Sequence, residues 1–147
     1  AKVAAYRLNP DLDIAIDSTP AYDLPVMYDA EPPDLENTVY NTRLGAGPAI
    51  YLADSGTLSD PRLVRHLVET AQAHNIPYQF RQPGGGGTDA GIIHRQREGI
   101  PSVSVSVPGR YAHTAAGIAR LSDWEHTLGL LYAALSWLSP DTLKSTL

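Results

Sequence analysis

The pattern of apolar residues marks four short segments of the 147-residue chain as strands. Residues 102–107 alternate serine and valine, which predicts a strand with one apolar face. Residues 13–17 alternate in the same way, so a shorter strand is expected to end at Asp17. The apolar run 47–53 and the segment 78–81 predict two more strands, which are bounded by glycine, proline and aspartate.

Helical spacing of apolar residues predicts helices between these strands. An Asp-Pro pair opens a helix over 60–75, which has a clear apolar stripe. Thr88 as an N-cap and Gly99 as a C-terminal glycine predict a helix over 88–99. A capping box at 122–125 predicts the start of an amphipathic helix over 122–139. Residues 1–8 are helical in composition but lack a cap, so we interpret Ala1 as a cut inside a helix of a longer protein.

The alternation of strands and helices predicts an α/β fold: one domain with a mainly parallel sheet and helices on both faces. The segment 18–43 is rich in proline and acidic residues, which is typical of a long loop.

Composition narrows the possible functions. The net charge is −5, and the 11 Lys and Arg residues are scattered, which disfavours a nucleic-acid partner. There is no cysteine, so any metal must be bound by His, Asp or Glu. No apolar run reaches the ~18 residues of a membrane span, which argues against a membrane partner, and we expect a cytoplasmic protein.

Two polar residues follow strands at the sheet edge where α/β proteins bind ligands. Asp17 ends the first strand, where a carboxylate suits a divalent metal; a turn-forming aspartate is the competing interpretation. His113 follows the strand 102–107 by a few residues and can reach the same crevice as a metal ligand; a structural histidine is the alternative.

Two further features have open interpretations. Arg110 is suited to bind a substrate carboxylate or carbonyl, and equally to form an ion pair. The glycine-rich turn 84–89, which includes Gly86 and Thr88, joins a strand to a helix, so its amides are suited to face an anion or an oxyanion. The same glycines also fit a close-packed turn without any ligand.

Five motifs, in this order, resemble the glutamyl aminopeptidase and tetrahedral (TET) aminopeptidase family of dinuclear metallopeptidases. They cover most of the chain and read DSTPAYDLP (17–25), RLGAGPAI (43–50), GGGTDA (85–90), GIPS (99–102) and PGRYAHT (108–114). The resemblance implies a partial metallopeptidase catalytic domain of the phosphorylase/hydrolase-like fold.

The resemblance also implies roles for individual residues. Asp17 corresponds to a ligand of one metal ion and His113 to a ligand of the other, with zinc or cobalt as the two divalent ions. The remaining ligands and the catalytic glutamate lie upstream of the first motif, so no catalytic residue is expected in this chain. Residues 1–147 then form the C-terminal segment of the catalytic domain, without the inserted second domain.

The activity implied is hydrolysis of N-terminal residues from peptides by a metal-activated water, in a homo-oligomer that is dodecameric in the family. Arg110, Gly86 and Thr88 are expected to shape the substrate pocket. Two positions depart from the family, because Gly109 stands where a larger residue is common and Thr114 where serine is common. An endoglucanase-like glycoside hydrolase and a non-catalytic small-anion-binding module are the alternative functions.

Overall fold

The computed structural model describes residues 1–24, 42–84 and 86–144. Its elements are, in chain order, α1 (Lys2–Leu8), β1 (Asp13–Pro20), β2 (Ala49–Tyr51), α2 (Pro61–Ala73), β3 (Gln79–Arg81), α3 (Ala90–Ile93), β4 (Ser102–Arg110), β5 (Ile118–Ala119), α4 (Leu121–Ser136) and the 3-10 helix η1 (Pro140–Leu143). Part of the long loop expected over 18–43 lies outside the described residues, and its first residues belong to β1. Within the described ranges, no helix has the length and apolar character needed to cross a membrane.

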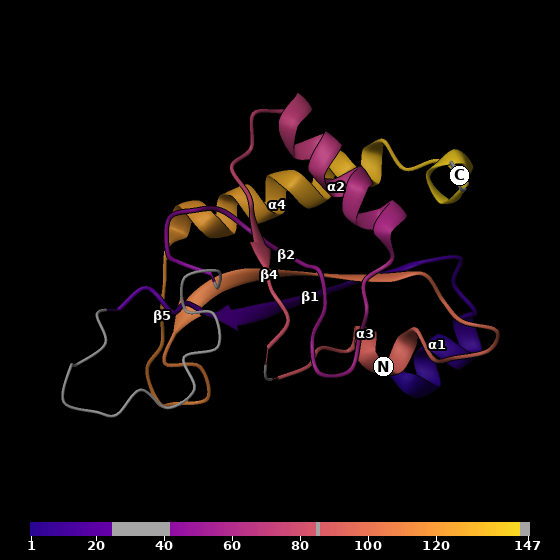
Figure 1. Cartoon of the computed structure of the whole chain (residues 1–147), viewed down its shortest axis with the longest axis horizontal. Helices are drawn as coiled ribbons and strands as arrows, with labels where there is room; N and C mark the ends of the chain where they lie inside the picture. Colours follow the sequence, from indigo (N-terminus) through magenta and orange to yellow (C-terminus); the bar gives the residue numbers. More distant parts are fainter. Residues whose placement is uncertain (25–41, 85, 145–147) are drawn as a thin grey trace.

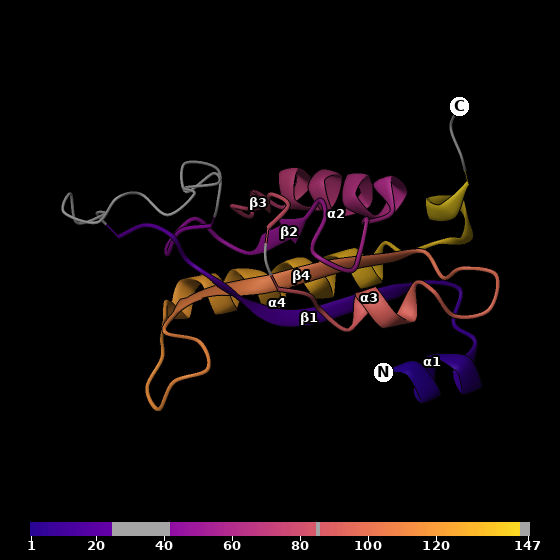
Figure 2. The same ribbon diagram turned by 60° about the horizontal axis from the view of Figure 1, so that its bottom comes forward.

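The described strands form a mixed sheet in the order β1-β4-β2-β3, and β5 pairs with β4. β1 is parallel to β4 and β2 is parallel to β3, whereas β2 is antiparallel to β4. Helices α2 and α4 pack together on one side of the sheet, and α3 lies against β1 and β4 on the other, with α1 beside it (Figures 1 and 2). The predicted α/β fold with helices on both faces is therefore confirmed.

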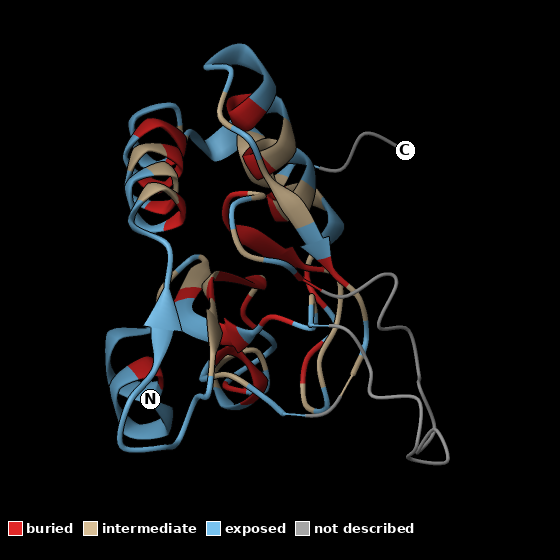
Figure 3. Ribbon diagram, turned by 90° about the vertical axis from the view of Figure 1, so that its left-hand side faces the viewer, coloured by how far each residue is buried: buried red, intermediate tan, exposed pale blue. Residues whose placement is uncertain are grey.

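Both faces of β4 are buried, but they differ in character. Val103 and Val105 are fully buried in the apolar core. That core is formed by Ile50, Leu63, Leu67, Ala71, Val103, Val105, Leu130, Leu131 and Ala134. Ser104 and Ser106 are also fully buried, on the opposite side of the strand. Figure 3 shows buried residues gathered on the inward sides of the helices and along the central strands.

The long helix predicted over 88–99 is reduced to the single turn of α3. Asp89 occupies its N-cap position without a side-chain cap bond, so Thr88 is not the cap. α3 ends at Ile93, and farther along the chain Arg97 and Gly99 have left-handed backbone conformations, with φ values of 55° and 102°. Gly99 therefore has the conformation that was predicted for it, but it does not end the helix.

The capping box predicted at 122–125 is absent, and its aspartate serves another purpose. α4 starts at Leu121 after Arg120, which makes no side-chain cap bond. The carboxylate of Asp123 is fully buried and accepts the N–H groups of Gly45 at 2.7 Å and Gly47 at 2.9 Å. Gly47 has φ 85°, and a Cβ there would lie 2.1 Å from the carbonyl oxygen of Pro77. Asp123 therefore fastens the tight turn before β2 to the first turn of α4.

Truncation of Leu67 tests the apolar core. Its side chain is fully buried between α2 and the sheet, so Leu67→Ala should lower the free energy of unfolding by about 2–5 kcal/mol in urea denaturation. Leu58 is 79% exposed, and Leu58→Ala should change that free energy by less than about 0.5 kcal/mol. Equal effects of the two substitutions would contradict this core.

Candidate functional site

Asp17 lies within β1, directly opposite Ser106 of β4, with which it shares a face of the sheet. Its side chain is exposed, and Oδ1 accepts the N–H of Ser18 at 2.7 Å. The hydroxyl of Ser106 is buried and has no hydrogen-bond partner among the described residues. A carboxylate open to solvent thus stands beside a buried polar atom that lacks a partner.

The sequence predicts that this strand ends at Asp17, but in the structure it continues to Pro20. The N–H groups of Asp13 and Ala21 donate to carbonyls on the β4 side, so the even-numbered residues between them direct their backbone nitrogen to the outer edge. Pro20 is one of these residues, and its missing N–H therefore costs no hydrogen bond to β4. An edge strand tolerates a proline that appears in the sequence to end it.

His113 lies in the exposed loop between β4 and β5, in a left-handed backbone conformation with φ 63°. Tyr111, two residues earlier, has φ 62°. The hydroxyl of Thr114 donates to the carbonyls of Tyr111 at 2.7 Å and Ala116 at 3.0 Å, which fixes the bend. Holding a non-glycine residue in this backbone conformation costs roughly 1–3 kcal/mol of free energy, and residues strained in this way are concentrated at functional sites.

The two departures from the family motif are compatible with this loop. Serine has the same hydroxyl as Thr114, so the exchange preserves the donor that makes both bonds. Gly109 pairs with Ala119 of β5, and a Cβ on Gly109 would lie 3.3 Å from the carbonyl oxygen of Ile118. Glycine therefore relieves a tight contact where β5 begins to pair with β4.

The carboxyl ends of β1 and β4 lie together; Asp17 lies three residues before the end of β1, and His113 lies three residues beyond the end of β4. The two strands are parallel and paired up to Pro20 and Gly109, and Figure 1 shows them running to the same end. Carboxylate oxygen and imidazole nitrogen are suitable zinc ligands, and both residues are exposed. In the described part of the chain, no three His, Asp or Glu side chains form a group able to hold a metal. The residues present therefore fit part of a metal site, and their convergence on one metal pair stays a prediction.

Arg110, at the end of β4, forms an ion pair with Asp23. Its Nη2 lies 2.8 Å and its Nε 2.9 Å from Oδ1 of Asp23, and both side chains are mostly buried. Oδ2 of Asp23 accepts the N–H of Leu44 at 2.9 Å. Of the two interpretations that the sequence left open, the ion pair is the one observed: Arg110 joins the segment after β1 to the start of the His113 loop.

The environment of Asp23 lowers its pKa. Burial opposes the charged form and would raise the pKa, but the hydrogen bond from Leu44 and the guanidinium of Arg110 together hold the pKa below its ordinary value of 3.8. The carboxylate of Asp23 is therefore ionised at neutral pH and keeps Arg110 in place.

Thr88 in the glycine-rich turn is held by Asp54. Oδ2 of Asp54 accepts the N–H and the hydroxyl of Thr88, each at 3.2 Å, and the Thr88 hydroxyl lies 2.7 Å from that of Ser104 on β4. Oδ1 of Asp54 accepts the N–H groups of Gly56 and Thr57, both at 2.7 Å. The turn is thus fixed to the sheet by a carboxylate of the chain itself.

Gly86 differs from Thr88, because it lies at the surface. It has φ 82°, and a Cβ there would meet nothing within 4 Å. Its carbonyl accepts the N–H of Ser55 at 3.1 Å. A left-handed conformation, and not close packing, explains the glycine at this position.

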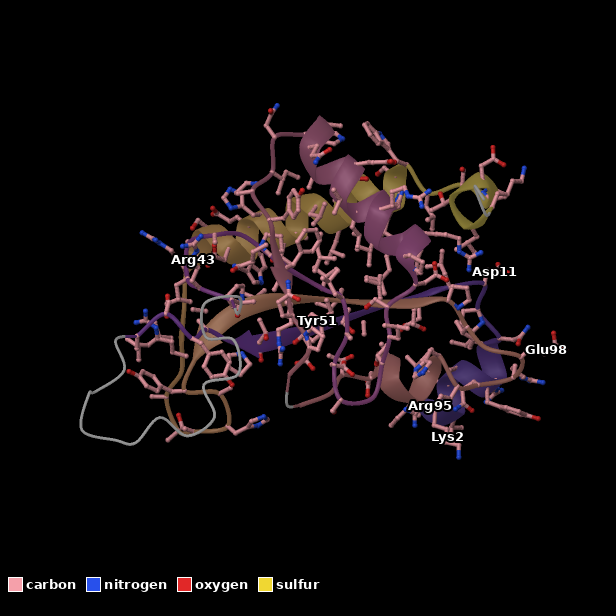
Figure 4. The ribbon with its side chains drawn as sticks, viewed as in Figure 1. Lys2, Asp11, Arg43, Tyr51, Arg95 and Glu98 are labelled. Atoms are coloured by element: carbon pink, nitrogen blue, oxygen red, sulfur yellow. The ribbon has the colours of Figure 1, made fainter. Side chains whose placement is uncertain are left out.

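Arg81 of β3 is a buried cation for which the sequence pattern gives no signal. It is 2% exposed, its Nε donates to the hydroxyl of Thr19 at 3.1 Å, and its Nη1 donates to the carbonyl of Gln82. Its guanidinium carbon lies 5.3 Å from the ring centroid of Tyr51, near the middle of the molecule (Figure 4). Thr19 and Asp17 share a face of β1, so Arg81 extends across the polar face of the sheet toward the carboxyl end of β1.

The lowered pKa of Asp23 predicts a pH-dependent contribution to stability. The contribution is present above the unfolded pKa of about 3.9 and is lost as the pH falls through the lower folded pKa. Asp23→Asn should therefore lower the urea midpoint near pH 7 and have little effect at an acid pH below the folded pKa. Asp141 pairs with Lys144 at the surface, where both side chains are more than 70% exposed, so Asp141→Asn should change little at either pH. A loss at Asp23 that does not depend on pH would contradict the ion pair.

Comparison with known proteins identifies the family. The chain is 32% identical over 141 residues to a lysyl aminopeptidase of Pyrococcus furiosus and 30% identical over 141 residues to a glutamyl aminopeptidase of Lactococcus lactis, covering 95% and 96% of this chain. The solved structure of an aminopeptidase from Desulfurococcus kamchatkensis matches 97% of the chain with a TM-score of 0.85 and 33% identity. The structure of PhTET1-12s, a dodecamer, matches 94% of it with a TM-score of 0.69 and 27% identity.

The chain spans between 36% and 38% of the length of these four proteins. The family model for M42 glutamyl aminopeptidase matches residues 1–130, which is most of the chain. The chain therefore belongs to the M42 glutamyl aminopeptidase family.

Proposed function

We propose that residues 1–147 form the C-terminal part of the catalytic domain of a metal-dependent aminopeptidase, which removes N-terminal residues from peptides. One observation carries the proposal. In a chain of the M42 family, the exposed carboxylate of Asp17 lies in the carboxyl half of β1, and the exposed imidazole of His113 follows the carboxyl end of β4, the parallel strand paired with it. In α/β folds this end of the sheet is where ligands bind.

Asp17 and His113 would each hold one of two divalent ions, zinc or cobalt. Bound there, the ions supply Lewis acidity toward the scissile carbonyl and lower the pKa of a bound water. Catalytic zinc sites usually have three protein ligands per ion, so two residues cannot hold two ions tightly. We propose, from the family resemblance, that the other ligands and the glutamate that accepts the water proton are supplied by other polypeptide of the complete enzyme.

The pocket residues act by holding loops in place. The ion pair with Asp23 fixes the position of Arg110. Arg110 directly precedes the loop that carries His113, so the same ion pair fixes the start of that loop. Asp54 and Ser104 fix the side chain of Thr88. Gly86, which is exposed in the same glycine-rich turn, then forms part of the wall of the substrate pocket. Arg110 and Thr88 thus position the substrate site, and Gly86 borders it.

The small-anion-binding alternative conflicts with the contacts of the glycine-rich turn. The N–H of Thr88, which would face such an anion, already donates to the negatively charged carboxylate of Asp54. A phosphate at this turn would be repelled by that carboxylate. The endoglucanase-like alternative needs two carboxylates on either side of a sugar bond, and the carboxylate of Asp23, which follows β1, is already bound by Arg110 and the N–H of Leu44.

Substrates and assembly are proposed from the relatives. Two of them are named for lysyl and glutamyl residues, so we propose peptides with free N-termini as substrates without choosing a side chain. Because the PhTET1-12s structure is a dodecamer, we propose a homo-oligomer for this protein as well. A cytoplasmic location fits a peptidase without cysteine or disulfides.

Substitution of the two ligands in the complete gene product tests the function. Asp17→Ala and His113→Ala should each lower kcat/KM for aminoacyl p-nitroanilides at least about 100-fold, because each removes a metal ligand. Each should also reduce the zinc bound per subunit, measured by elemental analysis. Residues 1–147 expressed alone should show no appreciable peptidase activity.

The matched controls are Asp11→Ala and His74→Ala, which remove an exposed aspartate before β1 and an exposed histidine at the C-terminal end of α2. Both variants should keep their metal content and activity. Unchanged metal content in Asp17→Ala and His113→Ala, or robust turnover by residues 1–147 alone, would refute the proposal.

A further inference from the structure

Ser106 is a fully buried residue whose hydroxyl has no hydrogen-bond partner among the described residues. Buried hydroxyls in folded proteins nearly always have a partner, because an unpaired one costs the free energy of removing it from water. The exception at Ser106 therefore needs an explanation. Its position suggests one, because Ser106 lies in the carboxyl half of β4, beside the candidate metal ligand Asp17.

The other serines of β4 show that an unpaired hydroxyl is not a general property of this strand. Ser102 and Ser104 lie on the same face as Ser106 and are also buried. The hydroxyl of Ser102 donates to the carbonyl of Ile100 at 2.9 Å, and that of Ser104 lies 2.7 Å from the hydroxyl of Thr88. This face of β4 thus pairs its hydroxyls at two successive positions and leaves the third for another acceptor.

The sheet register identifies the acceptor that Ser106 can reach. Ser106 pairs with Ala49 of β2 on one side and with Asp17 of β1 on the other. Ala49 offers only a methyl group, whereas Asp17 has a carboxylate on the same face. Neighbouring strands lie about 4.8 Å apart, a gap that a serine and an aspartate side chain together can span. Because Asp17 is exposed, its side chain can turn toward Ser106 without displacing packed atoms.

Arg81 covers this part of β4 but cannot accept the proton of Ser106. Arg81 starts on β3, and its Nε donates to the hydroxyl of Thr19 on β1 at 3.1 Å. In the sheet order, β2 and β4 lie between these two strands, so the Arg81 side chain crosses the polar face of β4. A guanidinium has donors only, so the hydroxyl hydrogen of Ser106 needs a different acceptor. The carboxylate of Asp17 is the acceptor in register.

We propose that Ser106 is a positioning residue for the metal ligand Asp17, to whose carboxylate its hydroxyl donates a hydrogen bond. The N–H of Ser18 already donates to Oδ1 of this carboxylate at 2.7 Å. A second donor from Ser106 fixes the orientation of the carboxylate and so directs its remaining lone pairs toward the ion. Ligating carboxylates are commonly held by such outer hydrogen bonds. The inference rests on the proposed function, because it takes Asp17 as a ligand.

Zinc affinity of the complete gene product tests the inference. Ser106→Ala should raise the dissociation constant for zinc, measured by competition with a chelator, about 10–100-fold. Ser106→Thr keeps a hydroxyl at this position and should stay within about threefold of the unsubstituted enzyme. The matched control is Ser102→Ala, which removes a buried hydroxyl from the same face of β4, in register with Asp13. It should leave the zinc affinity unchanged.

Two further measurements separate positioning from a purely structural role. In the enzyme stripped of zinc, Ser102→Ala should lower the Tm, because it leaves the carbonyl of Ile100 without its donor. Ser106→Ala should not lower it, because this hydroxyl has no bond to lose within the described residues. In a double variant with Asp17→Ala, Ser106→Ala should cause no further loss of zinc affinity, since Ser106 acts through Asp17.

Unchanged zinc affinity in Ser106→Ala, together with loss of zinc in Asp17→Ala, would overturn the inference and leave the proposed function intact. Equal losses in Ser106→Ala and Ser106→Thr, a lower Tm of zinc-free Ser106→Ala, or an additive loss in the double variant would also overturn it. In each of these cases the effect would not come from the hydroxyl acting on Asp17. Unchanged zinc binding in Asp17→Ala would refute the proposed function and the inference together.

Discussion

The parallel pairing of β1 with β4 is the constraint on which the rest of the molecule depends. Its register places Asp17 beside Ser106 and lets both strands end together. The same register gives the strand pair two unlike faces, because valines meet α2 and α4 on one side and serines meet the glycine-rich turn on the other. A slip of β1 by one residue would turn Asp17 toward the apolar core and Ile14 and Ile16 toward the polar face. The position of the candidate site is therefore decided by the same pattern that decides the core.

Most polar residues of the family motifs hold backbone in place. Asp23 binds Arg110 and the N–H of Leu44, and Asp54 binds Thr88 together with the turn at 56–57. Such charge-assisted hydrogen bonds are short and directional, so they position loops that have no regular secondary structure. Asp17 and His113 differ because both are exposed at the end of the sheet, which leaves them accessible to an external ligand.

The sequence predicted the parts of the fold that local pattern controls. The Ser-Val alternation of 102–107 and the stripe of α2 became a strand and a helix, because residues with these periods bury one face wherever they pack. The prediction failed where a residue far away in the sequence determines the contacts of a side chain. The pattern predicts Thr88 as a helix cap and residues 122–125 as a capping box, but the side chain of Thr88 binds Asp54, and Asp123 within the box accepts the N–H groups of Gly45 and Gly47. The local sequence does not indicate that β2 is antiparallel to β4, or that the side chain of Arg81 is buried against Thr19. Both features depend on strands that are far apart in the sequence.

For the candidate site, the sequence located two residues but could not complete a ligand set, and the structure gives a physical reason. Asp17 lies on the strand whose outer edge carries no partner among the described residues. On the side toward β4, Asp17 pairs with Ser106, so the neighbouring strand offers a buried hydroxyl and not a second carboxylate or imidazole beside it. A periodic pattern identifies a residue of a suitable type at the end of a predicted strand. A ligand set requires side chains from several separate segments to meet in space, and local periodicity does not encode that meeting.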